Sequence, residues 1–550
     1  MDAREPFLRL IGDMAPGGAA ALDWFATAPG ARNTLCSQFF FRCCGLLLVR
    51  ELARRGESPE TVTTDSPAQA LLLSALFTQR PRAPEILTAA PAGSRKHLRP
   101  PYAVALADLA LCLWTWTWAR LTRSRARPLP DDAPLLLLDT FLAAGDPDHD
   151  HYYPGLLEHL DDDARRRTVF AATVAGVGFA GLPGVFSRLR RARRNLLPRE
   201  DFLTLGDCFA AWRRALKTAQ LPLAPARFEG MDVATLAREE LSRLTAFDGI
   251  LGAFLNERFA FRLAAAGVRL ATVVDWFENQ AVDKGFNAGF RRYFPKARHL
   301  GYLGFLTSPL YLCQSPSPAE ERAGVLPGEL RGIGPGSAEI MSEFLPEKPF
   351  APAPAFRYRK ALEASDSPPP RKPFTVLVSL PLPMADSVGV LRAVVAILDQ
   401  LPVDVSVLVK RHPLVAEASL RHALGLPWPR RLQCVDGTFD TCIRRSHVQV
   451  SLTSSTSLEA VARGVPVIIV ANARGLTWNP VPASCAPCLH RLVRSPQALL
   501  AAILELHGQG PEQARLRQEA GKVFRERYFT PVSRETVHAF LGLSAASRTS

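Results

Sequence analysis

Hydroxyl side chains cluster after an apolar run in the second half of the chain, at Ser454, Ser455 and Thr456. The surrounding pattern predicts that a strand ends and a helix begins at this point. The free N–H groups of a helix start, together with several hydroxyls, form a good site for phosphate oxygens. Thr456 and Glu459 also have the spacing of a capping box, which explains part of the cluster by structure alone.

A second polar group follows another apolar run about forty residues earlier. Lys410, Arg411 and His412 stand directly before Pro413, which stiffens the turn. Two cations and an imidazole at the carboxyl end of a strand suit recognition of a nucleotide phosphate or ribose. Either motif alone is common, so the prediction of a nucleotide site depends on finding both in one domain.

The elements around these motifs alternate between strand and helix. Strands are predicted at residues 374–380, 403–410, 447–452 and 465–470, with helices at 387–401 and 456–463 between them. The first half has strand candidates at 60–65, 134–139, 168–174 and 268–275. Strands that alternate with helices predict parallel sheets covered on both faces, so we expect an α/β protein with two Rossmann-like, doubly wound domains facing a cleft.

Proline is dense between these halves. Twelve prolines are found between Ser315 and Pro373, a density that disfavours regular structure. We therefore predict a first Rossmann-like domain at 1–314, a proline-rich linker at 315–373, a second Rossmann-like domain at 374–530 that binds the nucleotide, and a C-terminal helix and tail at 531–550.

The paired motifs, Lys410 to Pro413 and Ser454 to Pro466, resemble the donor domain of GT-B glycosyltransferases that build bacterial capsule and lipopolysaccharide. They are most similar to enzymes with a His-Pro motif that use CMP-sugars, such as sialyl- and Kdo-transferases. The resemblance implies that His412 and the hydroxyl cluster contact the nucleotide. It also implies a nucleotide-sugar donor as substrate, no further cofactor, and an oligosaccharide or lipid-linked acceptor.

The segment that begins at Asp275, Asp-Trp-Phe-Glu-Asn-Gln, resembles a motif of surface carbohydrate biosynthesis proteins, although Ala281 and Val282 replace its Pro-Trp pair. The resemblance places this segment at the cleft and makes Glu278 and Asp283 candidates for deprotonating an acceptor hydroxyl. A structural alternative is that Glu278 caps the following helix. No Asp-x-Asp stands where a GT-A enzyme would hold its metal, so no metal ion is implied.

Three other functions remain open. A polymerase that moves polyol phosphate from CDP-glycerol or CDP-ribitol has similar motifs, but its Ser-rich turn typically follows an Asp-Tyr pair, where this chain has Leu452 and Thr453. A nucleotide-sugar epimerase would need more carboxylates and histidines in the cleft. A degenerate GT-B scaffold would bind partners without catalysis.

Charge and hydropathy restrict the partners further. The net charge of +14 predicts an anionic partner, and the absence of an RNA-binding signature disfavours nucleic acid. The densest basic run, residues 188–194, is as well explained by a solvated helix face. Without a secretory signal, we expect a cytoplasmic protein, peripheral at most on the membrane. Residues 168–186 are uncharged, but their glycines favour a buried strand and loop over a membrane anchor.

Overall fold

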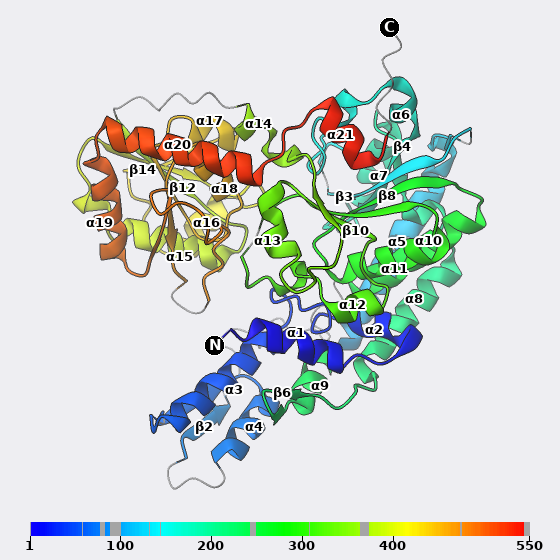
Figure 1. The fold of residues 1–550 in the computed structure, drawn as a ribbon, viewed down its shortest axis with the longest axis horizontal. Coiled ribbons are helices and arrows are strands. Elements are labelled where there is room, and N and C mark those ends of the chain that lie inside the picture. The colour runs from blue at the N-terminus through cyan, green and yellow to red at the C-terminus, as the bar shows by residue number, and fades with distance from the viewer. Residues whose placement is uncertain are drawn as a thin grey trace.

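The chain folds into two lobes, each built on a parallel sheet (Figure 1). The computed structural model describes residues 2–57, 59–77, 83–88, 101–130, 132–143, 145–242, 249–306, 308–363, 373–472 and 476–543. Both sheets are doubly wound, which confirms the predicted α/β class and its two Rossmann-like domains.

The N-terminal sheet has the strand order β11-β10-β9-β8-β3-β4-β5, and every neighbouring pair is parallel. The chain moves outward through β3, β4 and β5, then returns to the middle of the sheet at β8. The topological switch point therefore lies between β3 and β8. The strands are β3 (Leu135–Leu142), β4 (Thr168–Val174), β5 (Leu196–Pro198), β8 (Leu270–Trp276), β9 (Arg298–Leu303), β10 (Glu329–Gly332) and β11 (Phe350–Pro352).

The C-terminal sheet is also doubly wound. Its strand order is β14-β13-β12-β15-β16-β17, and every neighbouring pair is parallel. Its switch point lies between β12 and β15. The strands are β12 (Phe374–Ser379), β13 (Val405–Lys410), β14 (Leu432–Cys434), β15 (Val448–Ser451), β16 (Val467–Val470) and β17 (His490–Val493). The strands predicted at 374–380, 403–410, 447–452 and 465–470 are confirmed with small shifts at their ends.

Helices cover both sheets and close their cores. In the N-terminal lobe they are α5 (Pro101–Thr122), α6 (Asp162–Arg167), α7 (Leu182–Arg191), α8 (Leu205–Lys217), α10 (Ile250–Ala265), α11 (Ala281–Tyr293), α12 (Pro318–Arg322), α13 (Ala338–Met341) and α14 (Arg359–Leu362). In the C-terminal lobe they are α15 (Met384–Val395), α16 (Glu417–Leu424), α17 (Phe439–Ile443), α18 (Thr456–Ala462), α19 (Pro496–His507) and α20 (Pro511–Tyr528).

The prediction of an irregular linker at 315–373 is wrong for much of that segment. Strands β10 and β11 extend the N-terminal sheet, and α12, α13 and α14 pack around them. Proline has no backbone N–H to donate. Pro352 is tolerated because β11 is the edge strand, where an N–H that faces outward needs no partner. Residues 364–372, which include Pro368, Pro369 and Pro370 of the predicted linker, lie outside the described residues.

An N-terminal extension lies below the first lobe (Figure 1). It holds α1 (Arg4–Asp13), α2 (Ala21–Phe25), α3 (Phe39–Arg54), β1 (Thr61–Thr64), α4 (Pro67–Phe77) and β2 (Glu85–Thr88), and α9 (Ala234–Ser242) packs against it; a short hairpin, β6 (Arg227–Phe228) and β7 (Met231–Asp232), precedes α9. The predicted strand at 60–65 is therefore real, but it pairs with β2 in a separate small sheet.

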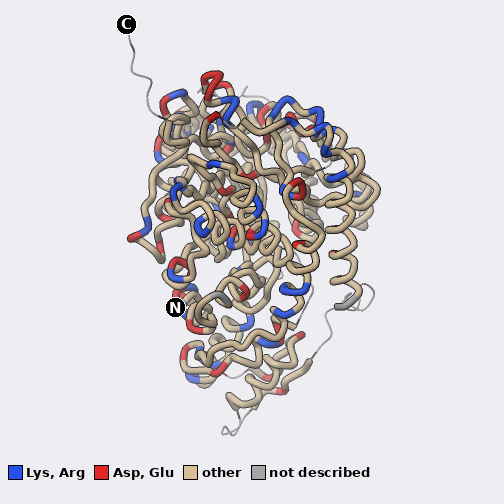
Figure 2. The backbone as a smooth tube through the Cα atoms, turned by 90° about the vertical axis from the view of Figure 1, so that its right-hand side faces the viewer, with Lys and Arg blue, Asp and Glu red and all other residues tan. Residues whose placement is uncertain are grey.

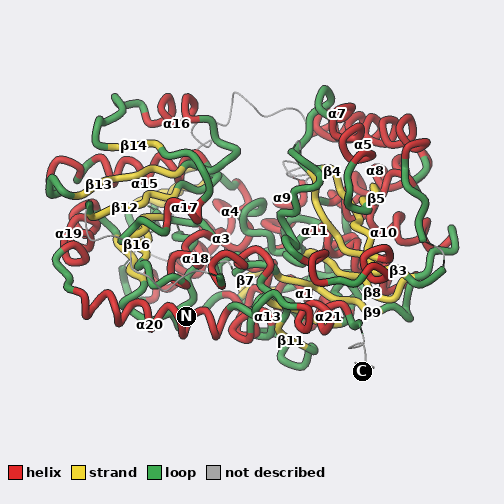
Figure 3. The backbone as a smooth tube through the Cα atoms, turned by 90° about the horizontal axis from the view of Figure 1, so that it is seen from above, coloured by secondary structure: helices red, strands yellow, loops and turns green. Residues whose placement is uncertain are grey.

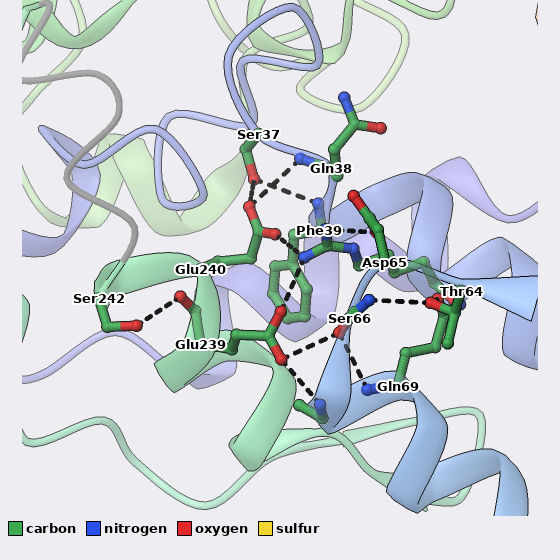
Figure 4. A network of polar contacts seen from close by, with 12 residues as sticks. Ser37, Gln38, Phe39, Thr64, Asp65, Ser66, Gln69, Glu239, Glu240 and Ser242 are labelled. Atoms are coloured by element: carbon green, nitrogen blue, oxygen red, sulfur yellow. Dashed lines mark hydrogen bonds and ion pairs between the residues drawn. The ribbon is translucent and has the colours of Figure 1, made fainter. Parts of the chain in front are cut away.

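A buried ion network fastens this extension to α9 (Figure 4). The Arg42 guanidinium of α3 pairs with Glu240, with Glu239 at 3.3 Å and with Asp65 at 3.0 Å. Glu239 also accepts hydrogen bonds from the Ser66 hydroxyl and from the backbone N–H at the start of α4. One guanidinium thus joins three segments that are far apart in sequence.

The last helix, α21 (Arg534–Leu541), crosses back to the N-terminal lobe. The Thr272 hydroxyl of β8 donates to the Leu541 carbonyl at 2.9 Å, and the Phe540 ring packs 5.2 Å from the Tyr302 ring. Apolar side chains from both sheets share one buried cluster, and Figure 3 shows the lobes side by side from above. The two lobes are therefore packed against each other.

Residues 168–174 form the buried strand β4, as predicted, and the loop and α7 that follow contain the rest of the uncharged stretch. Within the described part of the chain, no helix combines the length and the apolar character needed to cross a bilayer.

Candidate active site

The two predicted nucleotide motifs meet at the switch point of the C-terminal sheet. Ser379, the last residue of β12, is paired in register with Lys410 of β13. On the other side of β12, the Ser451 hydroxyl of β15 donates to the Ser379 carbonyl at 3.2 Å. Ligands of open parallel sheets bind outside the carboxyl ends of the strands at this point. The fold therefore brings both motifs to the expected edge.

In the turn that follows β13, the side chains of Arg411 and His412 make contacts within their own loop. Arg411 donates to the Val415 carbonyl at 2.9 Å and lies 3.4 Å from Asp436, so its guanidinium is committed to its own loop. His412 is half-buried and its Nδ1 accepts the Leu414 N–H at 3.2 Å. Burial, and then the nearby Lys410 ammonium, lower the pKa of His412, so its imidazole is neutral at pH 7.

The hydroxyl cluster forms its own network at the start of α18. The Ser454 and Thr456 hydroxyls lie 2.8 Å apart, and the Gln449 amide donates to Thr456 Oγ1 at 3.0 Å. The predicted capping box between Thr456 and Glu459 is wrong. Ser455, the residue before the helix, already has helical φ and ψ, so Thr456 lies inside the first turn and does not cap it.

Glu459 is consequently free of a capping role, and its carboxyl group is largely enclosed. Burial raises the pKa of Glu459 to about 7, although the Arg463 and Arg357 guanidinium groups act to lower it. A carboxyl that titrates near neutrality can accept or donate a hydrogen bond toward a ligand hydroxyl. Glu459 therefore stays a candidate ligand of the nucleotide, now with a side chain available for that role.

On the N-terminal side, Glu278 follows β8 at the other switch point. Its two carboxylate oxygens accept hydrogen bonds from Trp276 Nε1 at 3.0 Å and from Gln280 Nε2 at 2.6 Å. Burial raises the pKa of Glu278, while these two hydrogen bonds act to lower it. The carboxylate is thus oriented by two donors and made more basic by its surroundings.

Asp283 stands behind Glu278 and holds its turn. The Asp283 carboxylate accepts the backbone N–H groups of Glu278 at 3.0 Å and Gln280 at 2.8 Å, and it is the third residue of a capping box at the start of α11. Only 2% of Asp283 is exposed. The helix cap that we considered for Glu278 is therefore supplied by Asp283, whose contacts suit a positioning role better than a direct one.

A fully buried charge network supports the same turn. Asn279 has a left-handed backbone with φ of 56°, and its side chain contacts the Lys284 ammonium and Glu320. Glu320 pairs with Lys284 and, at 2.9 Å, with Arg32. The Arg32 backbone also has positive φ, at 55°. Two residues with left-handed backbones, Asn279 next to Glu278 and Arg32 near the N-terminus, are therefore held by one carboxylate.

Arg357 links the two halves of the site. Its guanidinium lies over the Trp276 ring, 5.9 Å from the centroid, and acts on the pKa of both Glu278 and Glu459. Trp478 of the C-terminal lobe likewise packs 6.2 Å from the Tyr311 ring of the N-terminal lobe. The carboxyl ends of the two sheets therefore face each other. Sequence reasoning missed Arg357 because it falls within the predicted linker.

Neither a protein-family model nor a curated protein matches this chain. Solved structures with a similar fold include Staphylococcus aureus MnaA with UDP, at 12% identity, covering 74% of this chain and 98% of that one, with a TM-score of 0.44. Others are UDP-GlcNAc 2-epimerase from Neisseria meningitidis bound to UDP-GlcNAc (11%, 74% and 99%, 0.41) and Acinetobacter baumannii MurG (11%, 74% and 99%, 0.39).

Proposed function

We propose that this protein is a glycosyltransferase that moves a sugar from a nucleotide-activated donor, with a CMP-sugar favoured, to a surface-polysaccharide or lipid-linked acceptor. The observation that carries the proposal is the arrangement of the two switch points. One presents an oriented, half-buried carboxylate at Glu278, and the other presents a cation, an imidazole and hydroxyls. The charge of Arg357 acts on a carboxyl group at each side, Glu278 and Glu459.

This arrangement supplies the parts that a sugar transfer needs. The acceptor hydroxyl attacks the anomeric carbon of the donor, and Glu278 takes the proton from that hydroxyl. The bond between the anomeric carbon and the phosphate oxygen breaks, and the nucleotide leaves with the electron pair. Lys410 and Arg357 would offset the negative charge that develops on the leaving phosphate.

The nucleotide itself would lie over the C-terminal switch point. Ser454, Ser455 and Thr456 would donate hydrogen bonds to phosphate oxygens, and the neutral imidazole of His412 would contact the phosphate or ribose. Glu459 would accept from a ribose hydroxyl. Arg411 is the weakest of the predicted ligands, because its guanidinium already serves the Val415 carbonyl and Asp436.

A thermal-shift screen against CMP, CDP, UDP and GDP tests the donor site. A ligand that binds only the folded protein raises its melting temperature, so one selective shift identifies the nucleotide class. A selective shift with CDP and turnover of CDP-glycerol would instead support the polyol-phosphate transferase. Absence of any shift would contradict the proposal and favour a scaffold protein.

Once a donor and an acceptor are identified, Glu278→Gln tests the base. The amide keeps the size of the side chain but takes no proton, so turnover should fall on the order of a hundred-fold or more while nucleotide affinity stays unchanged. Glu505→Gln, on the exposed face of α19, is the control. Full activity of Glu278→Gln would refute this assignment, as would parallel loss of folding and nucleotide binding.

A further inference from the structure

Helix α5 carries large apolar side chains that face solvent. Leu106 is 55% exposed, Trp114 39% and Leu121 65%. Their spacing places them along one side of the helix, with the small residue Ala110 between the first two. A helix of a globular domain normally turns such a stripe toward the core. On α5 the stripe points outward.

Neighbouring segments widen this stripe into a surface. Trp114 Nε1 donates to the Phe179 carbonyl at 3.1 Å, which brings Phe179, itself 49% exposed, next to α5. On the other side of α5, Trp116 Nε1 donates to the Leu203 carbonyl, just before α8. Leu205 and Phe209 of α8 are 44% and 48% exposed. We call these six residues, Leu106, Trp114, Leu121, Phe179, Leu205 and Phe209, the apolar face.

Arginines gather where α5 ends. Arg123, Arg125 and Arg127 follow the helix, and Arg191 and Arg193 stand at the end of α7. Arg127 donates to the Arg193 carbonyl at 2.8 Å, which joins the two groups. All five are exposed, and none pairs with an acid among the described residues. We call them the arginine cluster; a pocket of about 380 Å³ opens beside Arg123 and Arg127.

The basic run at 188–194 is therefore divided between two roles. Arg190 is buried and makes a two-pronged ion pair with Asp201, and Arg194 is buried against Asp150 at 2.8 Å. These two arginines hold the lobe together. Arg191 and Arg193, which lie between them in the sequence, have no such partner in the described chain and are exposed. The solvated face that we considered for this run therefore describes Arg191 and Arg193 but not Arg190 and Arg194.

We propose that the apolar face and the arginine cluster together form a docking surface for an anionic phospholipid bilayer. Apolar side chains enter the boundary between headgroups and acyl chains, and guanidinium groups bind lipid phosphates. Figure 2 turns this side toward the viewer and shows basic segments gathered at its upper right. A second copy of the chain fits this surface less well, because like charges of a +14 protein would be brought together.

This inference does not depend on sugar transfer, so it is tested with vesicles alone. The full-length protein should sediment with phosphatidylcholine vesicles that contain phosphatidylglycerol and much less with pure phosphatidylcholine. Arg123→Ala with Arg125→Ala should weaken binding about 25-fold, at about fivefold for each arginine. Arg430→Ala with Arg445→Ala, a pair of exposed arginines on the other lobe, should leave binding unchanged.

The apolar face has its own test. Leu106→Asn with Leu121→Asn should reduce vesicle binding at high salt, where the arginines are screened, by more than at low salt. Leu516→Asn with Val523→Asn, on the exposed side of α20, is the matched control. Equal binding to neutral and anionic vesicles would overturn the proposal. So would equal losses in test and control variants, or concentration-dependent dimers that the Leu106 and Leu121 changes abolish.

Discussion

The buried network around Glu320 allows a quantitative prediction for Glu320→Gln. Arg32, Lys284 and Glu320 are each fully enclosed, with both cations paired to the one carboxylate. These cations lower the pKa of Glu320 to about 2, against an ordinary value of 4.5. That difference corresponds to about 3 kcal/mol of stability at neutral pH. Breaking a buried pair by removing one partner costs about 3–5 kcal/mol, in agreement.

The pH dependence has a definite sign. Because the folded-state pKa is below the unfolded one, the stabilisation by Glu320 is complete above pH 4.5 and is lost as the pH falls toward 2. We therefore expect urea unfolding to show a large difference between wild type and Glu320→Gln at pH 7. The difference should shrink at about pH 3, where the carboxylate of the unfolded chain is protonated while that of the folded protein is still ionised.

The neighbouring Glu321→Gln is the control for this prediction. Glu321 pairs with Lys348 and Arg291, but 35% of its side chain is exposed, so its loss should cost less than about 1 kcal/mol. The reasoning is refuted if both variants lose the same stability at pH 7. It is equally refuted if the deficit of Glu320→Gln does not change between pH 7 and pH 3.

Three further predictions concern the site. His412→Ala should weaken nucleotide binding in calorimetry without changing the melting temperature. The control His422→Ala, at an exposed position of α16, should change neither the affinity nor the melting temperature. Unchanged affinity of His412→Ala would remove His412 from the site. Because burial raises the pKa of Glu459 to about 7, its protonated form stabilises the fold, and this contribution is lost as the pH rises through 7. Glu459→Gln should therefore flatten the fall of melting temperature between pH 6 and pH 8, and an unaltered slope would contradict that pKa. Arg357→Ala should slow turnover more than it weakens nucleotide binding, since its charge acts on both Glu278 and Glu459; an equal effect on both would place it with the nucleotide ligands instead.

Long apolar runs made the central strands predictable, because parallel strands buried on both faces have few polar positions. The segments 374–379 and 405–410 are examples, and their order already implied a doubly wound sheet. Strands β10 and β11 were missed because they are short and because β11, the edge strand, contains Pro352. An edge strand has free hydrogen-bonding groups on one side, so it accepts a residue that a central strand excludes.

The candidate site was predictable only where its residues follow a strand directly. Glu278 and His412 do so, and the sheet topology placed both at carboxyl ends. The capping role was misassigned, since a shift of one residue in the start of α18 removes Thr456 from the cap position. The buried partners Arg32 and Glu320 carry no local signal, because their meeting depends on packing between segments almost three hundred residues apart.

Arg357 shows why a site between two lobes is difficult to predict from sequence motifs. It lies where the chain leaves the N-terminal lobe, and the returning chain runs beside it, with Ala355 donating to the Thr530 carbonyl at 2.9 Å. Both crossings between the lobes are therefore hydrogen-bonded to each other close to this arginine. A charge at that place keeps its distance to Glu278 and Glu459 only while the crossings stay paired. The catalytic contribution that we propose for it therefore depends on the packing of the lobes, a property that no short stretch of sequence encodes.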